Sequence, residues 1–151
     1  MRLGMSKRAH VESRFEYKGY PCVVILMWHG HRCGYVGIKN FLGKGLEEAR
    51  KLRLIQYYDI ECHGGITYRD TTLFGQDDKN TYWIGFDCAH WQDLPDVCKM
   101  IEVFGDTANL EFAKRELSER RVIGKIWTKE DVEAECRKIV DQLIEYEEGK
   151  R

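Results

Sequence analysis

The sequence predicts an α+β fold in which an antiparallel sheet of about four strands carries a long C-terminal helix across one face. Three observations support this prediction. The first half of the chain has short runs rich in aromatic and β-branched residues, which are typical of strands. After Pro95 the apolar residues recur every three to four positions, as they do in helices. At 151 residues, the chain fits a single domain, 1–151, that buries a core without disulfide or metal support.

The first half of the chain predicts strands and one short helix. Residues 1–13 are polar and are expected to form a flexible arm. The run FEYKGYPCVVILMW from Phe15 predicts a strand, HGHR a turn and CGYVGIK a returning strand, which together make a β-hairpin. Residues 45–59 predict a short helix whose apolar positions fit one stripe only loosely. Residues 62–69 and 81–90 predict two further strands, joined by the polar loop DTTLFGQDDKN.

The second half of the chain predicts helices. Residues 95–104 and 109–121 have the spacing of two short helices, and residues 128–148 have that of a longer one. Thr128 is expected to be the N-cap of the last helix, with Asp131 in the capping-box position. This helix has one apolar stripe that should lie across the sheet, formed by Val132, Cys136, Ile139, Val140, Leu143 and Ile144.

Composition and charge narrow the class of protein. Hydrophobic residues make up 43% of the chain and charged residues 32%, as in soluble globular proteins, and the formal net charge is -1. Such a charge does not fit a protein that binds duplex nucleic acid, which needs many Lys and Arg contacts. The apolar run PCVVILMW is far shorter than the roughly 20 residues that cross a bilayer, and the N-terminal residues lack the apolar core of a secretory signal. We therefore expect a cytoplasmic protein whose six cysteines are thiols.

Polar residues cluster in two of the predicted strands. The segment HGGITYRD contains His63 and two glycines, and WIGFDCAHWQD contains Asp87, His90 and Asp93. Each residue taken singly has a structural explanation, such as a bulge at the glycines or a cap at the aspartate. Polar groups are costly inside a protein unless they are paired, however, so this density indicates a site. The glycines after His63 would let backbone N–H groups reach a phosphate or carboxylate oxygen.

Strand alternation divides residues 81–90 into two sets. The set expected to face the core is Tyr82, Ile84, Phe86, Cys88 and His90. The set on the other face is Trp83, Gly85, Asp87 and Ala89. The glycine beside Asp87 leaves room for close approach, so we expect a concave surface on that face. A site built from His63, Thr67 and Asp87 then requires only that the two predicted strands be neighbours.

Metal binding and thiol chemistry have weaker support. The three His/Cys pairs, at 31/33, 62/63 and 88/90, lack the two-to-four-residue separation that is typical of zinc ligands. The set His63, Asp87, His90 and Asp93 has the donor types of a catalytic metal site, but no known spacing supports it, so neither a metal nor a cofactor is expected. Cys88 shares a face with His90 in a regular strand. Apolar surroundings raise the pKa of a thiol, which favours a buried structural cysteine over a nucleophile.

Aromatic residues are an independent indication of a ligand. The Trp and Tyr side chains suited to stacking on a base are Tyr17, Tyr20, Trp28, Tyr35, Tyr68, Tyr82, Trp83, Trp91 and Trp127. Most of them are expected in the core. Arg32, Lys39 and Arg69 lie near the predicted strand ends, where they would hold phosphates. The sequence therefore allows a pocket that encloses a base and its phosphates.

Three runs, GHRCGYVGI, HGGITYRD and YWIGFDCAHWQD, followed by VEAECRKIVDQL in the last helix, resemble a group of small phage and prophage proteins of unassigned function. The likeness extends from about Tyr20 to Leu143, and residues 47–59 depart from it. It implies a phage-associated protein in the cytoplasm of the infected host cell, and no particular activity. It also implies a site at His63, Gly64, Gly65, Tyr68, Asp87, Cys88 and His90.

The leading hypothesis is a phage-type anti-defence protein that binds and sequesters a small nucleotide-derived immune signal without chemistry. It rests on the resemblance, the aromatic and arginine content, the glycine-rich strand ends and the lack of a recognised catalytic spacing. A pocket between subunits would enclose such a ligand, so a homo-oligomer is expected. The residues expected to bind the ligand are Arg32, His63, Gly64, Gly65, Thr67, Tyr68, Arg69, Trp83, Asp87 and His90.

Two other hypotheses stay open. The first is a phosphodiesterase-like hydrolase in which His63 or His90 acts as general acid or base, while Asp87 orients the imidazole or holds a metal. The second is a protein-binding inhibitor of a host defence factor, which would dock through charged helices such as FAKRELSERR.

Overall fold

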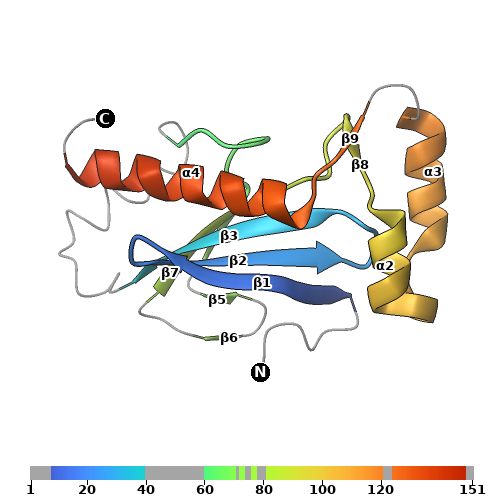
Figure 1. The fold of residues 1–151 in the computed structure, drawn as a ribbon, viewed down its shortest axis with the longest axis horizontal. Helices are drawn as coiled ribbons and strands as arrows, with labels where there is room; N and C mark the ends of the chain where they lie inside the picture. Colours follow the sequence, from blue (N-terminus) through green and yellow to red (C-terminus); the bar gives the residue numbers. More distant parts are fainter. Residues whose placement is uncertain are drawn as a thin grey trace.

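The computed structural model describes residues 8–39, 60–70, 72–73, 76–77, 81–120 and 124–148. Its main feature is a five-stranded antiparallel sheet. Across the sheet the strands are β1 (Ala9–Tyr17), β2 (Tyr20–Met27), β3 (Arg32–Lys39), β7 (Thr81–Asp87) and β4 (Tyr68–Asp70). A long C-terminal helix, α4 (Lys129–Glu147), lies across one face and contacts β1, β2 and β3 (Figure 1). The predicted α+β fold is therefore confirmed.

The sheet begins with three strands that follow one another along the chain. β1 turns into β2 at Lys18 and Gly19, whose φ values of 50° and 86° are those of a two-residue hairpin turn. The single strand predicted from Phe15 is therefore wrong, because this turn divides the run between β1 and β2. The expected flexible arm is also wrong for residues 9–13, which belong to β1. Residues 1–7 lie outside the described residues. β1 lies at the edge of the sheet, where one face is exposed to water, and it therefore contains polar residues. These residues gave its first half the composition of a loop, so the strand was not predicted there.

Apolar side chains cover both faces of the sheet. The larger core lies under α4 and includes Cys22, Val24, Val36, Ile38, Tyr82, Ile84, Phe86, Cys88, Val132, Cys136, Ile139, Val140 and Leu143. The smaller core, on the opposite face, is formed by Ala9, Val23, Ile25, Tyr35, Leu73 and Trp83. Adjacent residues of β7 therefore alternate between the two cores. This confirms the predicted core-facing set from Tyr82 to Cys88, because a strand directs successive side chains to opposite faces.

Helix α4 begins and packs as its sequence predicts. The Thr128 hydroxyl accepts a hydrogen bond from the Asp131 backbone N–H, and the Asp131 carboxylate accepts one from the Thr128 N–H, each at 3.1 Å. This capping box satisfies two N–H groups that the helix itself leaves without partners. The predicted stripe is buried against the sheet, with Ile144 partly buried. Burial of each such side chain stabilises the fold by about 1.5–3 kcal/mol.

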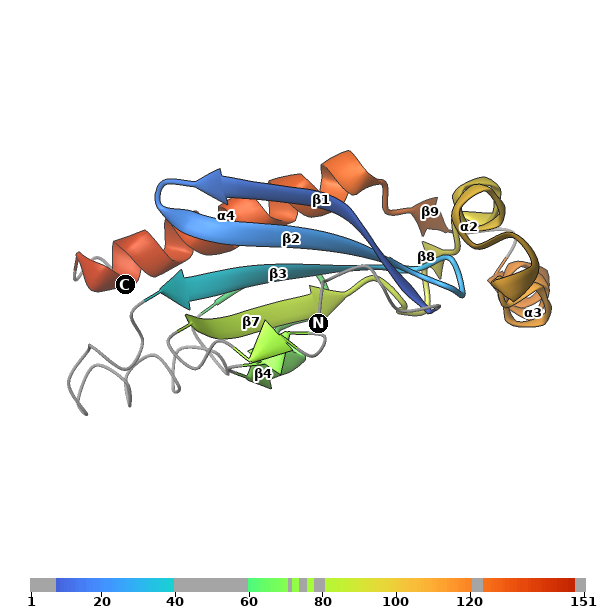
Figure 2. The same cartoon turned by 90° about the horizontal axis from the view of Figure 1, so that it is seen from below.

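Two shorter helices pack at one end of the sheet, beyond the turn between β2 and β3 (Figures 1 and 2). They are α2 (Val97–Phe104) and α3 (Leu110–Arg120), separated by a 3-10 turn, Gly105–Thr107. Both were predicted. Short strands complete the described residues: β8 (Asp93–Leu94) pairs in parallel with β9 (Lys125–Ile126), and β5 (Thr72–Leu73) pairs with β6 (Gln76–Asp77). The last pair lies in the predicted polar loop, and the predicted helix at 45–59 lies outside the described residues.

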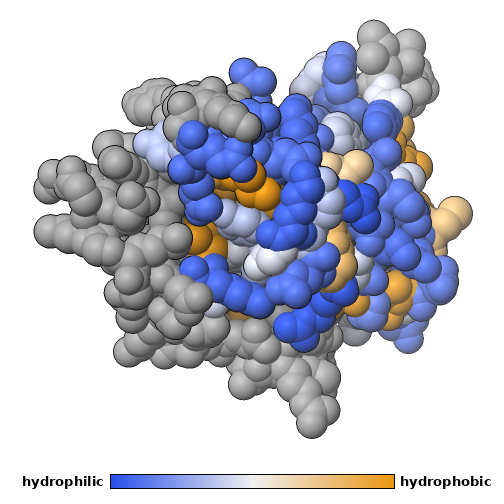
Figure 3. Space-filling view, turned by 60° about the vertical axis from the view of Figure 1, so that its left-hand side comes forward, coloured by the Kyte–Doolittle hydropathy of each residue, from blue (hydrophilic) through white to orange (hydrophobic). Residues whose placement is uncertain are grey.

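Figure 3 shows the end of the molecule near the C-terminus of α4, where the described side chains are mostly hydrophilic with smaller apolar areas. Among the residues that the structure describes, none of the helices combines the length and the hydropathy that a bilayer crossing requires.

Candidate functional site

The two polar segments identified in the sequence lie side by side. β4 pairs antiparallel with β7, with Tyr68 opposite Gly85, and the Thr67 N–H donates to the Gly85 carbonyl at 2.9 Å. The condition on which the sequence hypothesis depended, that the two segments be neighbours, is therefore met. The predicted strand at 62–69 is shorter than expected, however, because Gly64 and Gly65 have φ values of 71° and 82° and form a turn. This turn, rather than a strand, directs His63 toward the loop that follows β7.

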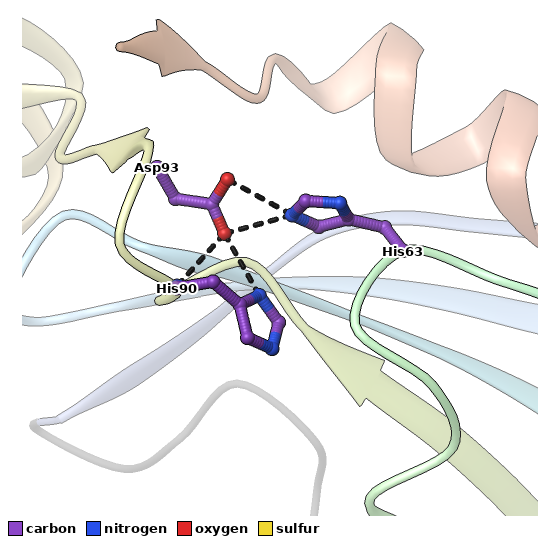
Figure 4. A group of neighbouring side chains, drawn as sticks. All are labelled: His63, His90 and Asp93. Carbon is purple, nitrogen blue, oxygen red and sulfur yellow. Dashed lines mark hydrogen bonds and ion pairs between the residues drawn. The ribbon is translucent and has the colours of Figure 1, made fainter. Parts of the chain in front are cut away.

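Asp93 is the centre of the candidate site (Figure 4). Its side chain is only 2% exposed, and it lies at the start of β8. The Nε2 atom of His63 lies 2.9 and 2.8 Å from the two carboxylate oxygens. The Nδ1 atom of His90 lies 2.9 Å from Oδ2, and the backbone N–H of His90 donates to the same oxygen at 2.8 Å. One buried carboxylate thus holds two imidazoles, and we call His63, His90 and Asp93 the histidine–aspartate cluster.

Electrostatics keep this carboxylate ionised. Burial by itself would raise the pKa of Asp93, but the hydrogen bonds from the His90 backbone N–H and from the His63 and His90 rings favour the anion and outweigh it. The pKa of Asp93 therefore lies below its ordinary value of 3.8. At neutral pH the cluster contains a buried negative charge between two groups that can take up protons.

Elements far away in sequence support His63 from behind. The Trp127 indole, just before α4, stacks on the His63 ring with a centroid distance of 4.0 Å and an interplanar angle of 23°. On the other side of the turn, the His63 backbone N–H donates to the Glu135 carboxylate of α4 at 2.8 Å. The Lys125 ammonium lies 4.4 Å from the centroid of Trp127. The orientation of His63 therefore depends on β9 and on the first turns of α4.

Gly64 is needed where it packs against His90. A Cβ atom at this position would overlap the His90 ring at Cε1 and Nε2, so no larger residue fits without a shift of the imidazole. The neighbouring Gly65 has open space around the same position. The sequence interpretation was that the glycines expose backbone N–H groups to a ligand. In the structure, Gly64 instead allows the His90 ring to lie against the turn.

Asp87 lies at the outer side of His90. One of its oxygens is 3.5 Å from His90 Nε2, and the other accepts a hydrogen bond from the Thr67 hydroxyl at 3.2 Å. The Ala89 backbone N–H also donates to Asp87, at 3.2 Å. His90 therefore lies between two carboxylates, one buried and one at the surface. Of the expected site residues, the structure brings His63, Gly64, Thr67, Asp87 and His90 together around Asp93.

Other expected ligand residues lie elsewhere. Trp83 is buried in the core on the face opposite α4, and Tyr68 packs on the same face with its ring against Tyr35 at 5.3 Å. The space beside Gly85 is filled by the Tyr35 ring, so the concave surface expected there is wrong. Arg69 is exposed on β4.

Arg32 is buried and has partners within the protein. Its guanidinium pairs with the carboxylates of Glu12 and Asp96 and donates to the Trp127 carbonyl at 2.9 Å. Arg32 and its two carboxylate partners, Glu12 and Asp96, line a hollow of about 410 Å³ beside the start of α4. The contact with Trp127 connects Arg32 to the wall behind His63, and its place as a phosphate ligand stays a prediction.

Cys62 and Cys88, the two cysteines that adjoin the expected site residues in sequence, have the properties of structural residues. All six are free thiols, and Cys88 is buried under α4. Burial raises the pKa of Cys88, and it raises the pKa of Cys62 to about 12. Neither thiol is therefore ionised at neutral pH, as a nucleophile would need to be.

Sequence reasoning undervalued Asp93 and missed the supporting residues. Asp93 was placed in the polar cluster and among possible metal ligands but not among the expected ligand-binding residues, although it lies three residues after His90, a spacing that suits a side-chain contact across a turn. Trp127 and Glu135 carry no local signal, because their contacts with His63 depend on how α4 crosses the sheet. Comparison of the chain with protein-family models, with curated proteins and with solved structures found no match in any of the three. The support for a chemical function therefore comes from the geometry of the site.

Proposed function

We propose that the protein is a hydrolase of phosphodiester or related bonds in nucleotides, with the histidine–aspartate cluster as its active centre. The observation that carries this proposal is the Asp93 carboxylate buried between two imidazoles. Both imidazoles reach the surface, since His63 is 23% exposed and His90 is 36% exposed. A buried anion that orients accessible imidazoles is the arrangement that general acid–base catalysis requires.

The two histidines have complementary roles in this proposal. Hydrolysis removes a proton from the attacking water and delivers one to the leaving oxygen. His90, the more exposed ring, lies beside Asp87 and is the group that takes the proton from water. His63, held by Trp127 and Asp93, returns a proton to the leaving group. Positioned groups of this kind accelerate a reaction by about 10²–10⁴-fold each.

The choice of nucleotides rests on the chemistry beside the cluster. The Trp127 ring stacks on His63, and the Lys125 ammonium lies 4.4 Å from the centroid of that ring, which places a cation next to the wall of the cluster. Cations of this kind bind phosphates. Sequestration without chemistry, the leading hypothesis from the sequence, needs a pocket but no acid–base cluster, so the geometry favours the hydrolase.

The test is to incubate the purified protein with a panel of cyclic and linear nucleotides, including ADP-ribose derivatives, and to analyse the solution by mass spectrometry before and after heat denaturation. The hydrolase predicts fragments with the wild type and none with His90→Gln. The matched control, His10→Gln, replaces a histidine of β1 outside the cluster and should leave the products unchanged. A nucleotide that disappears and returns intact on denaturation would contradict the hydrolase and support sequestration. Nucleotides that never leave solution would point to a protein partner.

A further inference from the structure

We propose that the histidine–aspartate cluster binds one divalent transition-metal ion, with zinc the expected metal. The ligand atoms are His63 Nε2, His90 Nδ1 and an oxygen of Asp93. The inference deepens the proposed hydrolase, on which its catalytic meaning rests, but metal binding itself does not require that any substrate be hydrolysed. Two imidazoles and one carboxylate form a ligand set used by catalytic zinc sites, which keep a fourth position for water or substrate.

The ligand atoms converge on one place. Both ring nitrogens lie within 2.9 Å of Asp93 Oδ2, and the cluster's ligand atoms all lie within 4.8 Å of one another. Zinc–ligand distances of about 2.0–2.2 Å in a tetrahedral site place ligand atoms roughly 3.3 Å apart. To hold the ion, the shortest contacts would open by a few tenths of an ångström, and the most widely separated ligand atoms, up to 4.8 Å apart, would close by up to about 1.5 Å.

The two carboxylates that face the ring nitrogens of His90 favour a cation bound at this ring. Its Nδ1 faces the Asp93 carboxylate at 2.9 Å, and its Nε2 faces the Asp87 carboxylate at 3.5 Å. A neutral imidazole has a single N–H, so one of its nitrogens would point a lone pair at a carboxylate oxygen. A metal at Nδ1 removes this conflict, because the lone pair binds the ion and the Nε2–H points to Asp87.

Residues around the cluster match the outer shell of metal sites. Ligating histidines almost always donate their other N–H to a carboxylate or carbonyl, which is the relation of His90 to Asp87. Asp87 is in turn held by the Thr67 hydroxyl and the Ala89 N–H. Gly64 fits closely against His90, and Trp127 stacks on His63, so both rings are oriented before any ion arrives. The carboxylates of Asp87 and Asp93 give the place a negative charge that attracts cations.

A bound ion would make the proposed hydrolysis easier. Zinc lowers the pKa of a bound water to about 7, so hydroxide is available at neutral pH. With an ion bound, His63 and His90 would both be ligands in place of their acid and base roles in the metal-free cluster. Asp87, 38% exposed, would remain the carboxylate beside His90, and the leaving oxygen would take its proton from solvent. The cluster then provides both the nucleophile and the charge that stabilises it.

The experiment uses the full chain, freed of metal with a chelator and titrated with Co²⁺ while its visible absorption is recorded, followed by competition with Zn²⁺. We expect about one ion per chain, displaced by zinc. His63→Gln should weaken binding by more than about 100-fold, and Asp87→Asn by about 10–100-fold. His10→Gln should bind as the wild type does. Circular dichroism identifies variants that are folded, and the ligand substituted is the partly exposed His63 rather than the buried Asp93.

Absence of Co²⁺ binding by the folded wild type would overturn the metal site, as would equal binding by wild type and His63→Gln. The two proposals fail separately. Turnover that survives chelation would keep the hydrolase and remove the metal. Stoichiometric binding without turnover of any nucleotide would keep the metal site and remove the hydrolase.

Discussion

Two pairs of histidines lie close together in this protein, and they differ in what lies between and around the rings. His29 and His31 have a ring-centroid distance of 5.2 Å, and the Phe112 ring packs against both. His63 and His90 have a ring-centroid distance of 4.9 Å, with the Asp93 carboxylate bonded to each. The distances are nearly equal. An aromatic ring packs against each pair, Phe112 in the first and Trp127 in the second, so the difference is the buried anion, which only the second pair has.

This difference gives the two pairs opposite chemistry. Burial, with a smaller contribution from His31, lowers the pKa of His29 to about 4, so this ring is uncharged at neutral pH. His31 is buried, and its Nδ1 lies 2.8 Å from the Cys88 carbonyl, which fixes the ring in the structure. In the histidine–aspartate cluster the Asp93 carboxylate lies within hydrogen-bond distance of both rings, and both rings reach solvent. Proximity of histidines is therefore not enough for a site; a paired charge and access to water are also needed.

The largest effect expected is on catalysis. His90→Gln and His63→Gln remove groups proposed to transfer protons, so each should lower the rate of nucleotide hydrolysis by about 10²–10⁴-fold. His29→Gln should leave the rate unchanged, because the first pair is not part of the site. Initial rates on a substrate found by mass spectrometry measure both. Equal losses for His29→Gln and His90→Gln would remove the distinction between the pairs.

The next largest effect is a pH dependence of the free energy of unfolding that arises from His29, in the pair formed by His29 and His31. The pKa of His29 is lowered from 6.5 to about 4, so the unfolded chain binds more protons than the folded one between these values. The free energy of unfolding should therefore fall as the pH drops from 6.5 to 4, by up to about 3 kcal/mol from this residue.

Urea denaturation at a series of pH values measures this dependence. His29→Gln should flatten the curve between pH 6.5 and 4, because glutamine does not titrate. An unchanged slope in that variant would mean that His29 is not the source of the acid sensitivity.

A smaller effect separates the two glycines beside the second pair. Gly64→Ala and Gly65→Ala both place a side chain at positive φ, with similar backbone strain. Only at Gly64 would the new Cβ meet the His90 ring. Gly64→Ala should therefore destabilise the protein by about 1–3 kcal/mol more than Gly65→Ala. Thermal unfolding of the two variants side by side gives the difference, and equal losses would mean that the imidazole moves away freely.

The smallest effect concerns the start of α4, next to the Trp127 ring that stacks on His63. Thr128→Ala removes the N-cap of α4 next to Trp127 and should cost about 1 kcal/mol. The substitution should change the fluorescence of the tryptophans and leave the pH dependence from His29 as it is. A loss well above this value would show that the capping box supports more of the fold than its own hydrogen bonds.

The sequence predicted the fold best where a local pattern coincides with a tertiary role. α4 has a cap and an apolar stripe in one segment, and the residues of β7 alternate between two cores. β1 was missed from Ala9 to Ser13 because an edge strand with polar residues has the composition of a loop. The turn at Gly64 and Gly65 was expected as strand, since glycine is compatible with both.

The site was predictable only in part. His63, Asp87 and His90 were found because they are dense in sequence. The contact of His90 with Asp93 is local, at a spacing of three residues, but the contact of His63 with Asp93 joins segments 30 residues apart that no local pattern brings together. Trp83 and Tyr68 were expected at the site but lie on the opposite face of the sheet. Strand alternation sorted the residues of β7 correctly, but it does not tell which face carries the site. Which residues meet at the site therefore depends on long-range packing, which local spacing in the sequence does not reveal.

The measurement that tests the central claim most directly is nucleotide turnover in water enriched in heavy oxygen, with wild type and Asp93→Asn compared by mass spectrometry. If the histidine–aspartate cluster hydrolyses its substrate, the wild type forms products that contain one heavy oxygen from water, and folded Asp93→Asn forms almost none. If every nucleotide of the panel stays intact and unlabelled with the wild type, or if Asp93→Asn forms labelled products at the wild-type rate, the cluster is not the active centre of a hydrolase.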